Sequence, residues 1–384
     1  MRIIHLGDLH LGKTLGEYSL IRDQEYILNQ VLDIIKEKDV NAILIAGDVY
    51  DRSLPSEAAV NLLDSFISKL ADMCIKTFII SGNHDSEDRL EYGSRLFSTR
   101  GIHIASLFNG ELAKVTTEDE NGELNIYMLP FVKASQVRHY CQNSSIETYE
   151  DAVRTVITQA DIDWAARNIL VAHQFVAGST APQIAGSEGA SVQNVGFVEQ
   201  ISSEILKNFD YVALGHLHSP QSVGYDHIRY SGSILKYSLN EASGSKSVPL
   251  IDIGEKGSVE IELLPLSPLR DLRHITGRLD QLLKAENITD SDDYMYVTLT
   301  DEDIINDVMG IVQQYYPNTV KIDYQNSHTI EIENFDIGEI VNDKSFEEII
   351  SDFYLKMYGT EISDEELDVM MSVAREAGVI NEAD

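Results

Sequence analysis

Cysteine is nearly absent from this chain of 384 residues, which contains only Cys74 and Cys141, far apart in the sequence. Two isolated cysteines provide neither a disulfide framework nor a closely spaced metal-binding cluster, as is typical of proteins from a reducing compartment. Long apolar runs are also missing. None approaches the roughly 18 residues that a membrane-spanning helix needs, and the N-terminus has no signal-peptide pattern. We therefore expect a cytoplasmic protein.

Positive charge is scarce as well, because 29 Lys and Arg stand against 63 Asp and Glu, for a formal net charge of −34. A protein that binds nucleic acid on its own normally has a basic patch, since contacts to phosphate supply much of the affinity. One interpretation is a solubilising acidic surface. The other is that metal ions and a partner subunit provide the positive charge that a polyanionic substrate needs.

The first part of the chain, residues 1–265, alternates between strand-like apolar runs and helical patterns. Apolar stripes with helical spacing run from Ile27 to Ile35 and from Val60 to Leu70, and Pro55-Ser56-Glu57 is typical of a helix start. This order predicts parallel strands covered by helices, in two stacked sheets with helices outside. Successive antiparallel strands, with a turn at Glu255-Lys256-Gly257, are predicted at Ile228–Tyr230, Val248–Ile253 and Val259–Leu263.

Further domains are expected, because the chain exceeds the roughly 250–300 residues that one hydrophobic core usually serves. A boundary is predicted near Pro265-Leu266-Ser267-Pro268. Residues 270–333 then predict a small α+β capping domain, which we interpret as shaping the substrate site. Its predicted elements are a strand at Tyr294–Leu299, a helix at Glu302–Tyr315 and a strand at Val320–Tyr324.

The C-terminal segment, residues 335–384, has fourteen acidic residues against three basic ones and predicts two amphipathic helices. A capping box, Ser363 with Glu366, opens the second helix. Either the apolar stripes pack on the body of the protein, or they form a docking element that needs a partner. The stripes consist of Phe346, Ile349, Ile350, Phe353, Tyr354 and Met357, and of Leu367, Met370, Met371 and Ala374.

Side chains that bind metals follow five of the predicted strands, at the point where each strand ends. Ligands collect beyond the carboxyl ends of the strands in α/β sheets, so these side chains are expected to lie close together. Five such strand ends predict a metal site, and the number of ligands suits two ions. The candidate ligands are Asp8, His10, Asp48, Asn83, His173, His216 and His218, and His84 and Asp85 follow the third of these strands as well.

A two-ion site for phosphate esters needs hard ligands, one of them an anionic group shared between the ions. Asp48, at the end of a central strand, is the best candidate for this bridge. Asp8 and His10 are two residues apart, so on a regular strand they would point the same way. Gly47 would relieve crowding where the backbone meets the ions, and Asn83 would add a neutral oxygen ligand.

The five blocks, in this order, resemble the signature of the calcineurin-like metallophosphoesterase superfamily: Asp-x-His, Gly-Asp-x-x-Asp, Gly-Asn-His-Asp/Glu, His and Gly-His-x-His. The resemblance implies a four-layer α/β sandwich, two mixed sheets flanked by helices, with a dinuclear centre. It implies that Asp8, His10, Asp48 and His218 hold one ion, and that Asp48, Asn83, His173 and His216 hold the other. His84 would stabilise or protonate the leaving oxygen, with Asp85 as a catalytic neighbour that orients it.

Within that superfamily, the chain is similar to the nuclease subunits of bacterial SbcCD complexes. The similarity is continuous over residues 1–265 and looser beyond them, and Asp51 stands where archaeal and eukaryotic relatives carry a histidine. The stretches that carry it are Gly82–Ser86 with Arg89-Leu90 and Ser94–Phe97, Phe209–Gln221, and Tyr230–Ser233 with Leu235–Ser238 and Glu241.

This resemblance implies a Mn²⁺-dependent DNA nuclease, with Mg²⁺ as the alternative metal, in DNA replication, recombination and repair. The implied activities are ATP-dependent 3′→5′ double-strand exonuclease and hairpin-opening endonuclease, on double-strand ends and hairpins. The implied partners are an SMC-family ATPase resembling SbcC and a second copy of the chain, as a homodimer within a heterotetramer. The alternative is a phosphodiesterase or phosphatase that acts on small substrates. A metal-free scaffold is disfavoured, because all seven ligands are present.

Overall fold

The computed structural model describes residues 1–142, 145–185, 200–326, 346–358 and 361–376. The chain forms two compact units, Met1–His274 with Asp292–Tyr294, and Ile275–Ser291 with Met295–Asp384. The division into residues 1–265, 270–333 and 335–384 stays a prediction. Within the described residues, no helix is long and apolar enough to cross a membrane.

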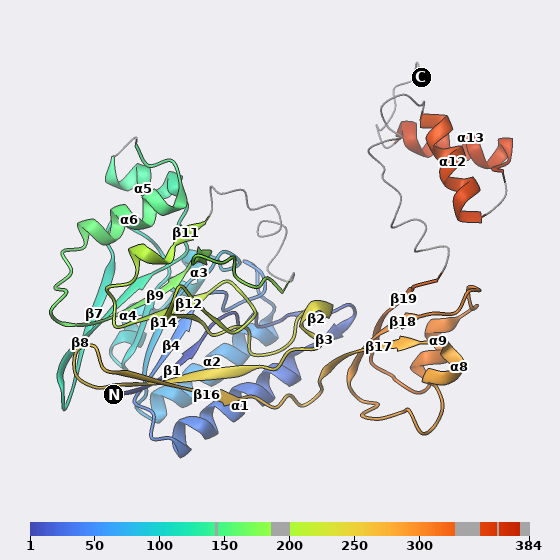
Figure 1. Cartoon of the computed structure of the whole chain (residues 1–384). Coiled ribbons are helices and arrows are strands. Elements are labelled where there is room, and N and C mark those ends of the chain that lie inside the picture. Colours follow the sequence, from blue (N-terminus) through green and yellow to red (C-terminus); the bar gives the residue numbers. More distant parts are fainter. Residues whose placement is uncertain (143–144, 186–199, 327–345, 359–360, 377–384) are drawn as a thin grey trace. The chain divides into compact units, whose positions relative to one another are not determined.

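The first unit contains two six-stranded mixed sheets (Figure 1). In the first sheet, β1, β4, β5 and β6 run parallel, while β15 pairs antiparallel with β1 and β16 antiparallel with β15. The order of its strands is β16 (Val259–Pro265), β15 (Ser247–Ile253), β1 (Arg2–Leu6), β4 (Ala42–Ala46), β5 (Lys76–Ile80) and β6 (Ile102–Ala105).

The second sheet has four parallel strands, β8, β9, β12 and β14, with β7 and β13 antiparallel at its edges. We predicted three successive antiparallel strands, and this is wrong for the first of them, because β14 pairs in parallel with β12 and belongs to the other sheet. The order of the strands is β13 (Gln221–Val223), β14 (Tyr225–Tyr230), β12 (Tyr211–Gly215), β9 (Arg167–His173), β8 (Gly122–Leu129) and β7 (Ala113–Asp119).

The two sheets share an apolar core, in which Leu44 of β4 and Val171 of β9 are fully buried. Helices α1 (Ile21–Glu37) and α2 (Glu57–Asp72) bury their apolar faces beside the first sheet (Figure 1). Helices α5 (Ala134–Cys141) and α6 (Tyr149–Gln159) pack against the second sheet. The predicted four-layer sandwich is therefore confirmed.

The helix patterns read from the sequence are largely correct. The predicted stripe of α1 is buried throughout, and the Ser56 hydroxyl caps α2 by accepting the Ala59 N–H. Val60 is the exception, because it is 43% exposed and Ala59 and Leu62 take its place on the buried face. The short elements of this unit are β2 (Thr14–Leu15), β3 (Tyr18–Ser19), α3 (Glu87–Glu91), α4 (Ser94–Ser98), β10 (Val176–Ala177) and β11 (Ile201–Ser202), with 3₁₀ turns at Ser203–Ile205 and Leu239–Glu241.

A small three-stranded sheet follows, in the order β17-β18-β19, with β18 and β19 parallel. The predicted strands are present, but the predicted helix is much shorter, because Asp307 adopts a left-handed conformation (φ 50°) that ends the helix on its N-terminal side. The predicted residues 327–333 lie outside the described residues. The elements are β17 (Leu272–Gly277), α8 (Leu279–Leu282), β18 (Tyr294–Leu299), α9 (Val308–Gln313) and β19 (Thr319–Tyr324).

The two predicted C-terminal helices are present as α12 (Phe346–Tyr358) and α13 (Asp364–Glu376). The capping box is also present, since the Ser363 hydroxyl and backbone N–H both donate to the Glu366 carboxylate, at 2.6 and 3.1 Å. Tyr354 joins the two helices through a hydrogen bond of 2.8 Å to Glu366. The side chains of Phe353 and Met357 lie outside the described residues.

Candidate metal centre

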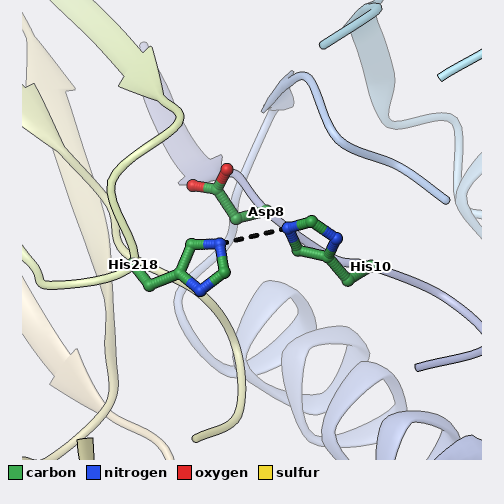
Figure 2. Close-up of side chains that lie close together, drawn as sticks. All are labelled: Asp8, His10 and His218. Atoms are coloured by element: carbon green, nitrogen blue, oxygen red, sulfur yellow. Dashed lines mark hydrogen bonds between the residues drawn. The ribbon is translucent and has the colours of Figure 1, made fainter. Parts of the chain in front are cut away.

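All seven predicted ligands lie at the carboxyl ends of strands from both sheets. Two of them, His10 and His218, point their Nε2 atoms at one another across 3.1 Å, with Asp8 beside them (Figure 2). The ligands from the first sheet follow β1, β4 and β5, while His173 ends β9 and the last two histidines follow β12. The complete set is Asp8, His10, Asp48, Asn83, His173, His216 and His218.

The backbone at these strand ends is strained. We expected Asp8 and His10 to share one face of a regular strand, but β1 ends at Leu6 and both residues have positive φ angles, 51° and 42°. Asp48 also has a positive φ angle, 47°. Each residue held in such a conformation destabilises the fold by about 1–3 kcal/mol. Two hydrogen bonds, from His10 N–H to Asp48 O (2.9 Å) and from Asp8 N–H to Gly47 O (3.2 Å), hold the two loops together.

Glycines provide the space that the ligands occupy. A Cβ on Gly47 (φ 81°) would overlap the His173 ring, and a Cβ on Gly82 would overlap the Asp48 carboxylate. The crowding predicted at Gly47 is therefore present. Side chains at these positions would push the ligands apart.

One group of side chains able to hold an ion consists of Asp8, His10 and His218, whose ligand atoms lie within 4.8 Å of one another. All three are buried. Asp8 Oδ1 accepts the His216 N–H at 2.8 Å, whereas Asp8 Oδ2 has no hydrogen-bond partner among the described residues. A buried carboxylate oxygen without a partner is costly unless a cation binds it.

Asp48 lies between the histidines of the two sheets. Its Oδ2 atom is 3.6 Å from His10 Nε2 and 3.4 Å from His173 Nε2, while Oδ1 accepts the His84 N–H at 2.9 Å. A second group, Asp8, Asp48 and His173, also has its ligand atoms within 4.8 Å of one another. The position of Asp48 suits the predicted bridge, and Asp8 belongs to both groups.

Asn83 connects His173 of the second group with His216. Its Oδ1 atom lies 3.1 Å from His173 Nε2 and 3.0 Å from His216 Nδ1. Carboxylate, amide and imidazole donors of this kind suit Mn²⁺, Fe, Zn²⁺ or Mg²⁺ more than soft metals. The donor set and the orphaned oxygen of Asp8 fit two divalent metal ions.

The electrostatics of the metal-free centre also favour a cation. Burial alone would lower the pKa of His173, but the Asp48 carboxylate outweighs it and raises that pKa to about 9. Burial raises the pKa of Asp8 to about 6 and lowers the pKa of His10 to about 4. The raised pKa favours a protonated His173 when no cation is bound, and binding of a metal ion at this imidazole would release that proton.

The structure corrects the role that we predicted for Asp85. Its carboxylate accepts the backbone N–H groups of Val49, Tyr50 and Gly82 at 2.9–3.1 Å, so it fixes the loop that carries Asp48. The hydrogen bond that orients His84 comes instead from Asp51, whose carbonyl oxygen accepts the His84 Nδ1–H at 3.1 Å. The sequence could not distinguish these contacts, because Asp85 is adjacent to His84 in either case.

Several supporting residues escaped the sequence analysis. Gln24 of α1 is buried and donates to His10 O at 2.7 Å, while its own oxygen accepts the Gly12 N–H at 3.0 Å. A signal for it existed, because Gln24 lies four residues before Leu28 and therefore on the face of the helix that carries the apolar stripe. Lys13 and Lys246, which bind carboxylates behind the histidines, had no such signal.

Comparison with known proteins gives matches to two family models and to solved structures. Among 67 matching chains of solved structures is a dimetal phosphatase from Danio rerio, 12% identical, with a TM-score of 0.40 over 70% of this chain and 98% of that one. Residues 268–358 match the SbcD_C family, described as type 5 capsule protein repressor C-terminal domain. Residues 1–220, more than half of the chain, match the calcineurin-like phosphoesterase family. The chain belongs to the calcineurin-like phosphoesterase family and is a metal-dependent hydrolase of phosphate esters.

Proposed function

We propose that this chain is a DNA nuclease that uses Mn²⁺, with Mg²⁺ as the alternative, and that it is the SbcD-type nuclease subunit of an SbcCD-type complex. The observation that carries the proposal is the combination of two family matches in one chain, the phosphoesterase match at residues 1–220 and the SbcD_C match at residues 268–358. The phosphoesterase fold alone serves many substrates. The second match favours DNA among them.

A cavity beside the metal centre supports a substrate larger than a phosphate group. It has a volume of about 660 Å³, and Asn83 and His216 line it together with Phe131, Tyr149 and Lys133. Aromatic faces stack on nucleobases, and an ammonium group pairs with phosphate. This lining suits a nucleotide better than a small phosphate monoester.

In the proposed reaction, bound metal ions would polarise the phosphodiester and lower the pKa of an attacking water. The seven proposed ligands would hold the ions, and the hydrogen bonds of Asp85 keep the Asp48 loop in place. Because His84 Nδ1–H donates to the Asp51 carbonyl oxygen, Nε2 of His84 is the atom available to hold a proton at the leaving oxygen.

We also propose an SbcC-like SMC-family ATPase as the partner, with DNA ends and hairpins as substrates in replication, recombination and repair. The chain has few positive charges for holding DNA, so the partner would supply many of the phosphate contacts. The C-terminal helices are the proposed docking segment, because Val369 and Val373 of α13 are 63% and 59% exposed. With this partner the expected activities are ATP-dependent 3′→5′ exonuclease and hairpin-opening endonuclease.

A homodimer within a heterotetramer is the proposed assembly. Tyr92 and Leu96, at α3 and α4, are 85% and 75% exposed, and large exposed apolar side chains close together often mark an interface. Leu96→Glu should therefore shift a dimer towards monomer in light scattering. An unchanged mass of the variant would place the interface elsewhere.

The direct test of the proposed function compares two substrates with the purified chain in Mn²⁺ and in Mg²⁺, a DNA hairpin and a chromogenic phosphodiester. Cleavage of both is expected, with Asp48→Asn as the inactive control. Cleavage of the chromogenic ester alone would favour the small-substrate phosphodiesterase, a function that the acidity of the chain also suits.

A further inference from the structure

The two histidines in Figure 2 share an arrangement that the proposed function does not use. Their Nε2 atoms meet at 3.1 Å, so their Nδ1 atoms face outwards, each towards a carboxylate. Asp51 Oδ1 lies 3.5 Å from His10 Nδ1, and Glu241 Oε1 lies 3.8 Å from His218 Nδ1. Both distances are longer than the usual hydrogen bond, and they place one carboxylate beside each outward-facing ring nitrogen.

A lysine binds each of these carboxylates from behind. Lys13 Nζ donates to Asp51 Oδ1 at 2.8 Å, and Lys246 Nζ donates to Glu241 Oε2 at 2.5 Å. We call Lys13–Asp51 and Lys246–Glu241 the two outer pairs. The outer pairs come from different parts of the chain, yet in both of them a lysine contacts a carboxylate that faces the Nδ1 atom of a ligand histidine. Both of these histidines belong to one metal position.

The pair of Lys246 and Glu241 is buried, and both side chains make further hydrogen bonds. Lys246 Nζ also donates to His218 O at 2.8 Å and to Ser233 Oγ at 2.7 Å, while Glu241 Oε1 accepts the Tyr237 N–H at 3.1 Å. Removing two charges from water is costly and offsets much of their mutual attraction, so a buried pair is weak evidence for a stabilising role. Its position behind a ligand points to a role at the metal centre.

The other metal position is supported differently. His173 Nδ1–H donates to a neutral backbone carbonyl, Ala46 O, at 2.7 Å. His216 turns its Nδ1 atom inwards, 3.0 Å from Asn83 Oδ1, and its ring stacks on Phe131 at an interplanar angle of 25°. A carboxylate behind an imidazole raises its strength as a metal ligand and fixes its orientation, and removal of such a partner typically costs about 10–100-fold in metal affinity.

We propose that the two outer pairs make the metal position of His10 and His218 the tighter of the two, with Asp51 and Glu241 as positioning residues that act through these histidines. The lysines fix the carboxylates behind the rings. The inference rests on the metal centre and is independent of which phosphate ester is the substrate.

The test is the binding of Mn²⁺ to the full-length, metal-stripped chain, measured by isothermal titration calorimetry. The unchanged chain should bind two ions in two steps of different affinity. Asp51→Asn and Glu241→Gln keep the shape of the side chain and remove its charge, so each should weaken the tighter step by about 10–100-fold and leave the weaker step unchanged. Asn83→Ala, at the other position, should weaken only the weaker step.

Asp119→Asn is the matched control, because the side chain of Asp119 is only 7% exposed and its carboxylate pairs with Arg167 at 2.7 Å, away from the ligands. It should leave both steps unchanged. Circular dichroism without metal establishes that each variant is folded, and if Glu241→Gln does not fold, Asp51→Asn decides the question. Hydrolysis of a chromogenic phosphodiester by Asp51→Asn should recover when Mn²⁺ is raised about 10–100-fold, which a misfolded protein would not do.

Unchanged binding steps in folded Asp51→Asn and Glu241→Gln would overturn the inference, as would a loss confined to the weaker step. Failure of the unchanged chain to bind Mn²⁺ at all would instead refute the metal centre. Two binding steps without any cleavage of DNA would refute only the proposed substrate.

Discussion

The metal centre and the C-terminal helices both place side chains in environments that are unfavourable for the isolated chain, but in opposite ways. The metal centre buries charged groups, and Asp8 Oδ2 has no partner there among the described residues. The C-terminal helices instead expose apolar side chains, such as Val369 and Val373, on an acidic segment. The first arrangement is costly without cations, and the second without an apolar surface. The first region suits a metal ion, and for the second we propose a protein partner.

The largest effect is expected for Asp48→Asn, which removes the anionic group between His10 and His173. Activity should fall by more than about 100-fold, since even partners behind the ligands are worth 10–100-fold. Elemental analysis should find fewer than two ions per chain, while circular dichroism stays unchanged. Retention of two ions would show that Asp48 is not the bridge.

His84→Ala should separate metal binding from chemistry. Because the His84 ring donates to Asp51 O and only the backbone N–H of His84 contacts the ligand Asp48, the variant should keep both ions and lose about 10²–10⁴-fold in kcat, the usual worth of general acid help. Metal content and kcat measured on the same preparation check this. Loss of an ion would make His84 a ligand.

The protonation of His173 predicts a pH dependence of metal binding. Its pKa is about 9 in the metal-free protein, so a proton must leave at neutral pH, and the affinity for Mn²⁺ should rise about tenfold per unit between pH 7 and 8.5. The same raised pKa stabilises the metal-free fold below the unfolded pKa of about 6.5, a contribution lost as pH rises through 9. Calorimetry in buffers of different protonation enthalpy measures the released proton. An affinity independent of pH would contradict this.

Removal of the C-terminal helices should have the smallest effect on chemistry. A chain that ends after residue 344 should hydrolyse a small phosphodiester within about twofold of the full chain, because the ligands all lie within residues 1–218. It should no longer co-purify with an SbcC-like ATPase. Unfolding of the shortened chain, or full binding of the ATPase, would mean that the helices belong to the core.

The sequence predicted the layers and the convergence of the ligands well, because apolar periodicity and strand ends are local signals. The stripe of α1 and the position of His173 at the end of β9 are examples. It could not predict the left-handed turns at Asp8 and His10, since such conformations in residues other than glycine depend on contacts between loops. The assignment of β14 to the second sheet failed for a related reason, because alternation reports a buried face and not a pairing partner.

Crystals of the full chain with Mn²⁺, measured at a wavelength with anomalous scattering from manganese, test the two-ion centre most directly. Two peaks are predicted, one contacting His10 and His218 and the other contacting Asn83 and His173, with the Asp48 carboxylate between them. A single peak, or two peaks that Asp48 does not join, would contradict the centre described here.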